Sequence, residues 1–471
     1  MARLSERDYI YYTTVNGMCR SCREVVPARI VFRGNEVWQE RLCHRCGTGS
    51  ALIAGDKEWY LDRMSEPRCD HSPLTASSIR PKNRKGCPRD CGPCAWHASP
   101  CQLPVISVTN ACNLRCPICF TYNRSDRLYY MPVEQMRQTV DWIAEACGEC
   151  DLINITGGEP LLHPGIFDII RICQRPEIGR ITLNSNGIVP ASDYSVCERL
   201  AQLGVYVILS VNTFDPETSI RIHGRDLAEI KLRAIENLSK AGVRMTLLNV
   251  LIHGENEDVP GNLLELVRTH DNILSVTIQT MTYTGQGGGS FPKTQHIPAD
   301  VAADILCSGL NGEIEPSDFV SRPSAHPLCY SLCYFFKLEN IFLPFSRVLT
   351  TEELHEKLKM SYLLRVDDNT DFFTDIINRL YAMGRTDVLP EFKKLIQRLF
   401  PSDRSLGQFE RQKNAESSVR TIYIHSHMDE DTFDCSRAAL CPDLVPSEPG
   451  RMIPACTYNL FYRRQDENFY V

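Results

Sequence analysis

The chain has 471 residues, 43% hydrophobic and 23% charged, so it has the composition of a globular protein with a sizeable core rather than of a disordered chain. Its 58 acidic and 51 basic side chains give a net charge of −7, which provides no electrostatic case for nucleic-acid binding. The sequence contains no apolar run of about 18 residues that would span a membrane. Because the charged start also lacks the apolar core of a secretion signal, we expect a cytoplasmic protein whose 22 cysteines bind metals rather than form disulfides.

The first cysteines of the chain form two Cys-x2-Cys knuckles, Cys19 with Cys22 and Cys43 with Cys46. About twenty residues lie between the knuckles and read as a hairpin whose turn is a Gly-Asn dipeptide. Two knuckles at this spacing can place four thiolates at the corners of a tetrahedron. We therefore predict a rubredoxin-like or zinc-ribbon domain over residues 1–65, with a closed structural site for zinc or iron. Four unconnected buried thiols are the alternative.

Residues 66–103 carry a second cysteine group with the spacing Cys87-x3-Cys91-x2-Cys94. Cys101 is the nearest candidate for a fourth ligand, and Cys69 is the other. The same spacing recurs a few residues later in the chain, and this repetition favours an auxiliary 4Fe–4S cluster over a second zinc knuckle.

From residue 104 to residue 290, short apolar runs alternate with helical stretches such as Val133–Ala146, whose apolar residues recur at helical spacing. This alternation predicts an α/β fold, namely a partial TIM-like (β/α)6 barrel, with an open doubly wound sheet as the alternative. The six predicted strands are Val105–Val108, Leu152–Ile155, Ile181–Leu183, Val205–Val211, Met245–Leu251 and Ser275–Gln279.

Each predicted strand runs directly into a polar motif. In α/β barrels the carboxyl ends of the strands build the active site, so these motifs should share one mouth. The first motif, Cys112-x3-Cys116-x2-Cys119, supplies only three thiolates, and a 4Fe–4S cluster held by three cysteines keeps one iron open for another ligand. A degenerate zinc site is the alternative, but the Gly-Gly-Glu-Pro sequence after the second strand disfavours it.

With this motif pair, the chain resembles the radical S-adenosylmethionine (radical SAM) enzymes. The resemblance implies that SAM chelates the open iron and is cleaved by an electron to methionine and a 5′-deoxyadenosyl radical, which abstracts hydrogen from the substrate. It also implies SAM contacts: the glycines allow close approach, the glutamate accepts a hydrogen bond from the SAM ammonium group, and the aromatic residue lies beside adenine. Capping of the following helices is the alternative for the serine and asparagines. The residues concerned are Phe120, Gly157, Gly158, Glu159, Pro160, Asn186, Ser210 and Asn212.

Longer sequence segments make the resemblance specific to one group within these enzymes. Among them are GCPRDCGPC, TNACNLRCPICF, HPLC and IPACTYNLFYR. Over roughly residues 10–465 the chain is similar to the tetraether-lipid synthase group, also described as class D radical SAM methylases. This similarity implies a rubredoxin-like site and three 4Fe–4S clusters. Three features depart from the pattern of that group: the sequence CHRC in the second knuckle, an extra Cys333 and the glycine-rich loop Gly285–Ser290. These departures weaken the inference that this chain acts on the same substrate as that group.

The C-terminal region, residues 291–471, contains the candidate ligands of a third cluster. These are Cys329, Cys435, Cys441 and Cys456, with Cys333 as a substitute for one of them. His425-x-His427-x-Asp429 also suggests a hydrolase metal site, but no complementary ligands precede it. We expect these residues to line the substrate pocket or support the last cluster, with His425 as a candidate for proton transfer.

The segment Thr351–Leu399 is apolar and helical, with Phe372, Phe373, Ile376, Ile377 and Leu380 at helical spacing. Core or lid packing and a tunnel for an alkyl chain both fit this pattern, and the segment's place in the sequence suggests that it covers the barrel mouth.

We therefore predict a radical SAM enzyme that abstracts hydrogen from an unactivated C–H bond, for carbon–carbon bond formation on a lipid chain. The alternatives are methylation of a small molecule or pterin, and peptide maturation. The expected partners are the substrate and a reductant such as flavodoxin or ferredoxin, with no nucleic acid, and peripheral membrane contact is left open.

Overall fold

The computed structural model describes residues 7–68, 84–92, 94, 96–121, 126–293, 296–338, 342–359, 361–363, 371–416, 418–448 and 451–469. Cys69, weighed above as a cluster ligand, and the side chain of Phe372 lie outside this set. The described strands form two sheets, one made by the N-terminal domain alone and one that runs through the rest of the chain.

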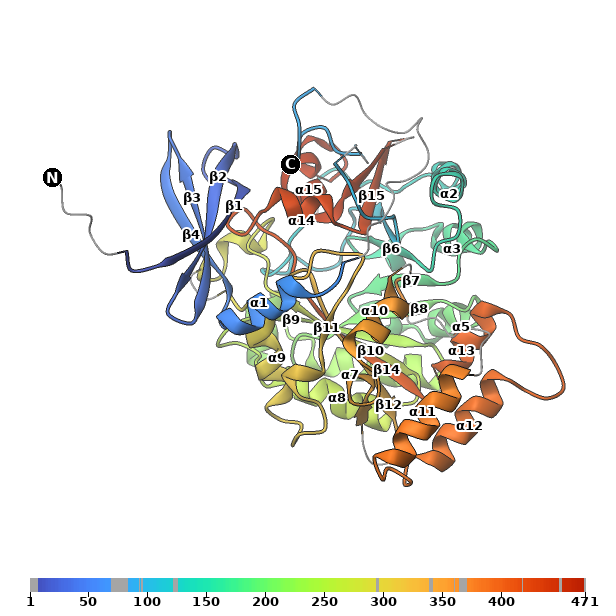
Figure 1. Cartoon of the computed structure of the whole chain (residues 1–471). Helices are drawn as coiled ribbons and strands as arrows, with labels where there is room; N and C mark the ends of the chain where they lie inside the picture. The colour runs from blue at the N-terminus through green and yellow to red at the C-terminus, as the bar shows by residue number, and fades with distance from the viewer. Residues whose placement is uncertain are drawn as a thin grey trace.

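The N-terminal domain is an antiparallel sheet in sequence order, made of β1 (Ile10–Met18), β2 (Val25–Arg33), β3 (Glu36–Cys43) and β4 (Gly47–Ala54), followed by α1 (Lys57–Ser65). The predicted hairpin is the β2–β3 pair, in which Arg33 pairs with Glu36 across the turn. Helix α1 starts where the Asp56 side chain accepts a hydrogen bond from the Trp59 amide. In Figure 1 this domain lies at the left edge of the molecule.

The second sheet contains all six predicted strands in parallel and in sequence order. A helix follows each strand, so the predicted partial (β/α)6 barrel is confirmed. The strands are β5 (Leu103–Thr109), β6 (Ile153–Gly157), β7 (Ile181–Ser185), β8 (Tyr206–Ser210), β9 (Met245–Leu251) and β10 (Ile273–Thr280).

The helices of these units pack on the convex face of the sheet. In α2, Met136, Val140 and Ile143 are at most 1% exposed and point to the sheet, as their spacing predicts. Burial of each such side chain stabilises the fold by about 1.5–3 kcal/mol. The helices are α2 (Val133–Cys147), α3 (Ile166–Cys173), α4 (Ile188–Ser192), α5 (Tyr194–Gln202), α6 (Pro216–His223), α7 (Ala228–Lys240), α8 (Val259–Thr269) and α9 (Ala299–Cys307).

Residues after α9 extend the same sheet at both edges. Strand β14 (Val419–His425) lies parallel to β10, and β12 (Tyr330–Lys337) pairs with β14 in the antiparallel sense. At the other edge β15 (Asp443–Glu448) pairs with β5. The Tyr330 hydroxyl donates a hydrogen bond to the Asp443 carboxylate, so side chains connect the two edges of the open barrel. The remaining short elements are β11 (Val320–Ser321), β13 (Phe342–Pro344), β16 (Arg451–Pro454), α14 (Cys435–Ala439) and α15 (Ala455–Thr457).

Four helices cover part of the concave face. They are α10 (Thr351–Leu358), α11 (Asp371–Ala382), α12 (Leu389–Leu399) and α13 (Gln408–Ala415), and α11 and α12 lie at the lower right of Figure 1. Tyr423 of β14 packs with these helices, whereas its neighbours Ile422 and Ile424 pack with the convex-face helices. The alternation of side chains along a strand therefore divides the interior into two cores.

The helical segment encloses an apolar cavity of about 70 Å³. Its lining includes Arg180, directly before β7, together with Ser275 and Val419 at the starts of β10 and β14. These are the amino ends of the parallel strands. The expectation that residues 351–399 cover the barrel mouth is wrong for their described part, because these helices pack at the opposite end of the barrel.

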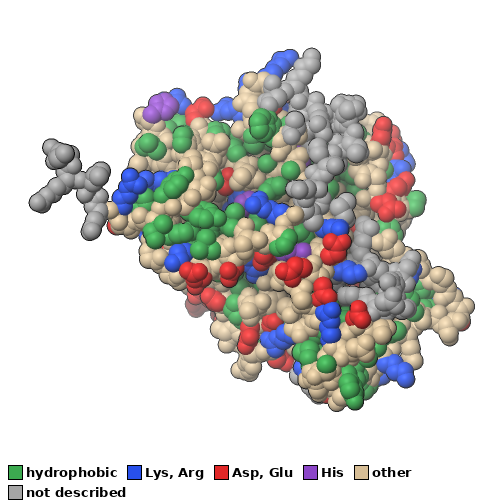
Figure 2. All heavy atoms as spheres, viewed as in Figure 1, with side chains coloured by type: hydrophobic (Ala, Val, Ile, Leu, Met, Phe, Trp, Pro, Cys, Tyr) green, Lys and Arg blue, Asp and Glu red, His purple; other side chains and the backbone are tan. Residues whose placement is uncertain are grey.

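Acidic and basic side chains are interspersed over the face shown in Figure 2, in agreement with the near balance of the two charges in the sequence. Among the described residues, no helix is both long enough and apolar enough to cross a bilayer.

Candidate active site and metal centres

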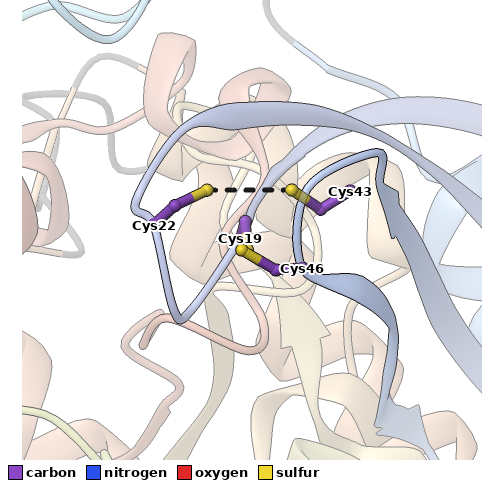
Figure 3. A group of neighbouring side chains, drawn as sticks. All are labelled: Cys19, Cys22, Cys43 and Cys46. Atoms are coloured by element: carbon purple, nitrogen blue, oxygen red, sulfur yellow. Dashed lines mark hydrogen bonds between the residues drawn. The ribbon is translucent and has the colours of Figure 1, made fainter.

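The four N-terminal cysteines converge as their spacing predicts. The four cysteine sulfurs all lie within 4.8 Å of one another, and those of Cys22 and Cys43 are 3.7 Å apart (Figure 3). The four residues are Cys19, Cys22, Cys43 and Cys46. A tetrahedral zinc site with Zn–S distances near 2.3 Å has sulfur–sulfur edges of about 3.8 Å, so the residues fit the ion. A hydrogen bond from the Glu24 backbone is the largest effect that lowers the pKa of Cys22, to about 7. The Cys22 thiol therefore loses its proton more readily than an ordinary cysteine thiol.

The three-cysteine loop follows the carboxyl end of β5. Cys112, Cys116 and Cys119 interact electrostatically with one another, and the Cys119 amide donates to the Cys116 carbonyl at 3.0 Å. Burial and the neighbouring acidic groups raise the pKa of Cys112 to about 11 and that of Cys116 to about 12. Clustered, half-buried thiols of this kind lose their protons when they bind a cationic cluster, so the donor set fits iron–sulfur ligation.

The two glycines after β6 lie against the backbone that leads into the cysteine loop. A Cβ atom on Gly157 would lie 2.2 Å from the Thr109 carbonyl oxygen, and one on Gly158 would lie 2.2 Å from that of Ala111. The Gly158 amide donates to Thr109 and the Glu159 amide to Ala111. The close approach that these glycines allow in the structure is to the protein backbone, and their predicted contact with a ligand stays a prediction. They therefore join β6 to the cysteine loop.

Glu159 is fully buried, and its carboxylate accepts hydrogen bonds from the amides of Asn186 at 2.7 Å and Leu161 at 3.2 Å. Burial raises its pKa to about 7. Lys231 of α7 donates to the Asn186 carbonyl at 2.6 Å, and burial lowers its pKa to about 8. Glu159 and Lys231 thus hold the backbone at Asn186 from both sides.

Sequence reasoning missed Lys231. A signal for it exists, since Lys231 lies among Ala228, Ala234, Ile235 and Leu238 on the buried stripe of α7, where an apolar residue is expected. His223 was missed as well, and its Nδ1 lies 3.8 Å from the Cys116 sulfur.

The other predicted SAM contacts occupy neighbouring strand ends. The Asn186 amide group donates to Asn113 of the cysteine loop at 2.7 Å. Asn212 is 1% exposed, and its side-chain oxygen accepts the Val250 amide, so it links the ends of β8 and β9. It does not cap the following helix α6, whose N-cap is Asp215. Phe120 stacks on His427 with ring centroids 5.8 Å apart, and His427 lies beside His425. The C-terminal histidines therefore lie at the same mouth as the cysteine loop.

The structure regroups the cysteines of the predicted auxiliary sites. Cys87 interacts with Cys91 and with Cys435, which is 348 residues away in the sequence, and Cys91 interacts with Cys94. Cys435 was expected to join the C-terminal group, but α14 begins at Cys435 and places its thiol beside Cys87. Cys435, and not Cys101, is therefore the candidate for the fourth ligand beside Cys87, Cys91 and Cys94.

Cys101 instead lies beside Cys147 at the end of α2 and near Cys150. The C-terminal group includes three cysteines that interact with one another, Cys329, Cys441 and Cys456, and Cys101 interacts electrostatically with Cys441 as well. Arg437 of α14 donates to the Cys329 sulfur at 3.5 Å. Cys333, the alternative ligand, is buried beside Cys307 in the convex-face core.

Comparison with known proteins agrees with this arrangement. Residues 106–267 match the radical SAM superfamily model, and residues 11–55 match the model of the HMPTM N-terminal zinc ribbon domain. The chain is 24% identical to the 7,8-dihydro-6-hydroxymethylpterin dimethyltransferase of Methanocaldococcus jannaschii over 96% of this chain and 94% of that protein.

Other matches cover less of the chain. The GTP 3′,8-cyclase of Chlorobaculum tepidum is 30% identical over 35% of this chain and 50% of that protein. The crystal structure of Streptococcus suis SuiB bound to precursor peptide SuiA matches at a TM-score of 0.38 and 18% identity, covering 43% of this chain and 44% of that chain. The family match covers the three-cysteine loop and the Gly-Gly-Glu-Pro sequence. This chain is a radical SAM superfamily enzyme, with a radical SAM α/β fold and an N-terminal zinc ribbon.

Proposed function

We propose that this enzyme is a radical SAM methyltransferase that acts on a reduced pterin. The observation that carries the proposal is the extent of the similarity to the archaeal pterin dimethyltransferase, which covers 96% of this chain and therefore includes the ribbon, the barrel and the C-terminal region. The match to the GTP cyclase covers only 35% of this chain, so it carries no argument for a substrate.

We assign Cys112, Cys116 and Cys119 to the cluster that binds SAM. When bound, this cluster and SAM supply the radical that abstracts hydrogen. Glu159 and Asn186 orient the amino-acid part of SAM, since Lys231 and the Glu159 carboxylate hold the Asn186 backbone next to the cysteine loop. Phe120, stacked on His427, contacts the adenine side of the site. The remaining predicted SAM contacts, Gly157, Gly158, Pro160, Ser210 and Asn212, shape the same mouth.

The polarity of the barrel interior supports a heterocyclic substrate over an alkyl chain. Leu183 and Leu209 belong to the convex-face core, so their neighbours Asn184 and Ser210 point to the concave face near the carboxyl ends of β7 and β8. The Asn184 side-chain oxygen is buried without a hydrogen-bond partner among the described residues. A pterin offers N–H donors to such acceptors. The apolar cavity, in contrast, lies at the amino ends of the strands.

We further propose two auxiliary 4Fe–4S sites, one held by Cys87, Cys91, Cys94 and Cys435 and one that includes Cys329, Cys441 and Cys456. With the SAM cluster these make three clusters, in addition to zinc in the ribbon. Clusters of this kind need a low-potential one-electron donor, so we propose flavodoxin or ferredoxin as the reductant and the cytoplasm as the location.

The test is an anaerobic assay of the reconstituted, reduced enzyme with SAM and 7,8-dihydro-6-hydroxymethylpterin. We expect formation of 5′-deoxyadenosine and a methylated pterin detected by mass spectrometry. A parallel reaction contains a membrane-lipid extract, because coupling of lipid chains was the first expectation from the sequence, and another contains peptides. Loss of lipid hydrogen with no change in the pterin would contradict the proposal and favour lipid coupling, and modification of peptides alone would favour maturation.

A further inference from the structure

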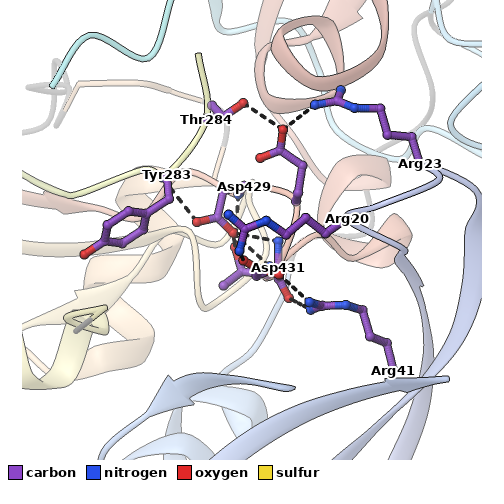
Figure 4. A network of polar contacts seen from close by, with 9 residues as sticks. Arg20, Arg23, Arg41, Tyr283, Thr284, Asp429 and Asp431 are labelled. Carbon is purple, nitrogen blue, oxygen red and sulfur yellow. Dashed lines mark hydrogen bonds and ion pairs between the residues drawn. The ribbon is translucent and has the colours of Figure 1, made fainter. Parts of the chain in front are cut away.

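A group of ion pairs between the zinc ribbon and the rest of the enzyme lies far from the SAM cysteines in the sequence. It joins three arginines of the ribbon to the loop that follows β14, residues 426–434, which we call the acidic loop. Arg20 and Arg41 both bind the Asp431 carboxylate, and Arg23 binds that of Glu430 at 2.5 Å (Figure 4). The Asp431 and Glu430 side chains are 17% and 9% exposed, so the acidic side of this contact is largely shielded from water, while Arg20 is 38% exposed.

The metal knuckles determine where these arginines point. Arg20 lies inside the first knuckle, between two of its cysteines, and Arg23 directly follows that knuckle with a φ of +58°. A non-glycine residue rarely adopts this conformation without support, and here the Arg23 amide donates to the Cys19 carbonyl at 2.7 Å. Arg41 precedes the second knuckle on β3. Closure of the first knuckle around zinc therefore fixes the backbone that carries Arg20 and Arg23, while β3 holds Arg41 two residues before the second knuckle.

The acidic loop carries groups that reach both proposed auxiliary sites. At its start the Met428 amide donates to the Cys456 sulfur at 3.3 Å, and His427 contacts the same sulfur at 3.4 Å. At its end the chain enters α14, whose first residue, Cys435, lies beside Cys87. Within the loop, the Asp429 carboxylate accepts hydrogen bonds from the amides of Asp431 and Thr432, so the residues of the loop are bonded to one another.

The same loop also contacts the end of β10. Asp429 accepts the Tyr283 amide at 3.3 Å, and the Thr284 hydroxyl donates to Glu430 at 3.3 Å (Figure 4). Glu430 is thus shared between a ribbon arginine and a residue of the barrel mouth.

We propose that the zinc ribbon is a clamp on the acidic loop, and that Arg20, Arg23 and Arg41 act as positioning residues for the auxiliary iron–sulfur sites. Zinc closes the knuckles, the knuckles orient the arginines, and the arginines hold the loop that presents Cys435 and the groups bonded to Cys456. This inference rests on the proposed cluster ligands and does not depend on the identity of the substrate.

The test measures the rate at which the anaerobic, fully loaded enzyme releases iron to a ferrous chelator. Partners outside the ligand shell typically change metal affinity about 10- to 100-fold, so we expect Asp431→Asn to accelerate release from the auxiliary sites about 10-fold or more. Asp431→Glu keeps the charge and should restore slow release. Electron paramagnetic resonance spectra of the auxiliary clusters should change in Asp431→Asn, while SAM cleavage without substrate continues.

Arg33→Gln is the matched control, because Arg33 also belongs to the ribbon but pairs with Asp8 and Glu40. It should leave iron release unchanged. Removal of zinc through Cys46→Ser should reproduce the effect of Asp431→Asn. Unchanged iron release in Asp431→Asn, equal acceleration in Arg33→Gln, or stable auxiliary clusters after zinc loss would each overturn the clamp. None of these readouts requires turnover of a pterin, so failure here is distinct from failure of the proposed function.

Discussion

The ribbon site and the SAM-cluster loop use the same ligand atom for opposite purposes. In the ribbon, four sulfurs within 4.8 Å of one another complete a tetrahedron and leave no position for a substrate. In the loop after β5, the three cysteines that we propose as cluster ligands would leave one iron of the cluster open. The ribbon is built on a small antiparallel sheet, whereas the loop stands at the carboxyl edge of a parallel sheet. The comparison teaches that two features together distinguish a structural site from a catalytic one. These are the number of cysteine ligands and the location of the site, on an antiparallel sheet or at the carboxyl edge of a parallel sheet.

The largest effect that distinguishes the two regions should come from Cys116→Ala. With two cysteines left, the SAM cluster loses a ligand, and 5′-deoxyadenosine formation should fall to background while the ribbon keeps its zinc. The control is Cys197→Ala, since Cys197 is a fully buried cysteine of the barrel whose thiol donates to the backbone carbonyls of Pro190 and Asp193 and not to the cysteine loop. SAM cleavage by Cys116→Ala at a rate near that of the wild type would contradict the assignment of Cys116 as a ligand of the cluster that binds SAM.

A slightly smaller loss is expected from Gly158→Ala, which tests how β6 supports the cysteine loop. The new methyl group would meet the Ala111 carbonyl at 2.2 Å, so the loop must move. A displacement of about 1 Å at a reaction centre costs about 100-fold in rate, and SAM cleavage should fall by about that factor. Gly261→Ala in α8 meets no atom within 4 Å and should leave cleavage unchanged. Equal rates in the two variants would show that the glycine contact does not position the loop.

Cys22→Ala should act on folding more than on SAM cleavage. Zinc binding contributes about 10–16 kcal/mol to small zinc domains, so loss of one of four ligands should release zinc and unfold the ribbon. We expect one zinc fewer per chain by elemental analysis and a lower unfolding temperature, with SAM cleavage partly retained. A variant that folds normally yet loses all SAM cleavage would give the ribbon a catalytic role.

The smallest effect concerns the connection from α1 to the C-terminal region. Burial alone would raise the pKa of Glu66, but hydrogen bonds from His355 and Ser321 and the charge of Arg63 lower it to about 2. A carboxylate with a lowered pKa stabilises the fold above its unfolded-state pKa, near 4.3, and loses this contribution as pH falls toward 2. Glu66→Gln should therefore lower the free energy of unfolding by about 2–3 kcal/mol at pH 7. The exposed Glu58→Gln is the control, and equal stability of both variants would contradict this assignment.

Local patterns in the sequence determined the elements and the two metal motifs. The Cys-x2-Cys knuckles, the alternation of strands and helices and the polar motif at each strand end were readable because each depends on neighbouring residues. The glycines of the Gly-Gly-Glu-Pro sequence were also found, although their contact proved to be the backbone of Thr109 and Ala111.

Tertiary structure alone decided which distant cysteines meet. Cys435 lies beside Cys87 rather than with Cys441, because α14 starts at Cys435 and the acidic loop before it is held by the ribbon. The helices after residue 351 likewise pack at the amino ends of the strands, since Tyr334, Phe336 and Tyr423 offer an apolar concave surface there. Spacing along the chain specifies a site when its ligands are adjacent. When they come from different elements, the packing of those elements specifies it.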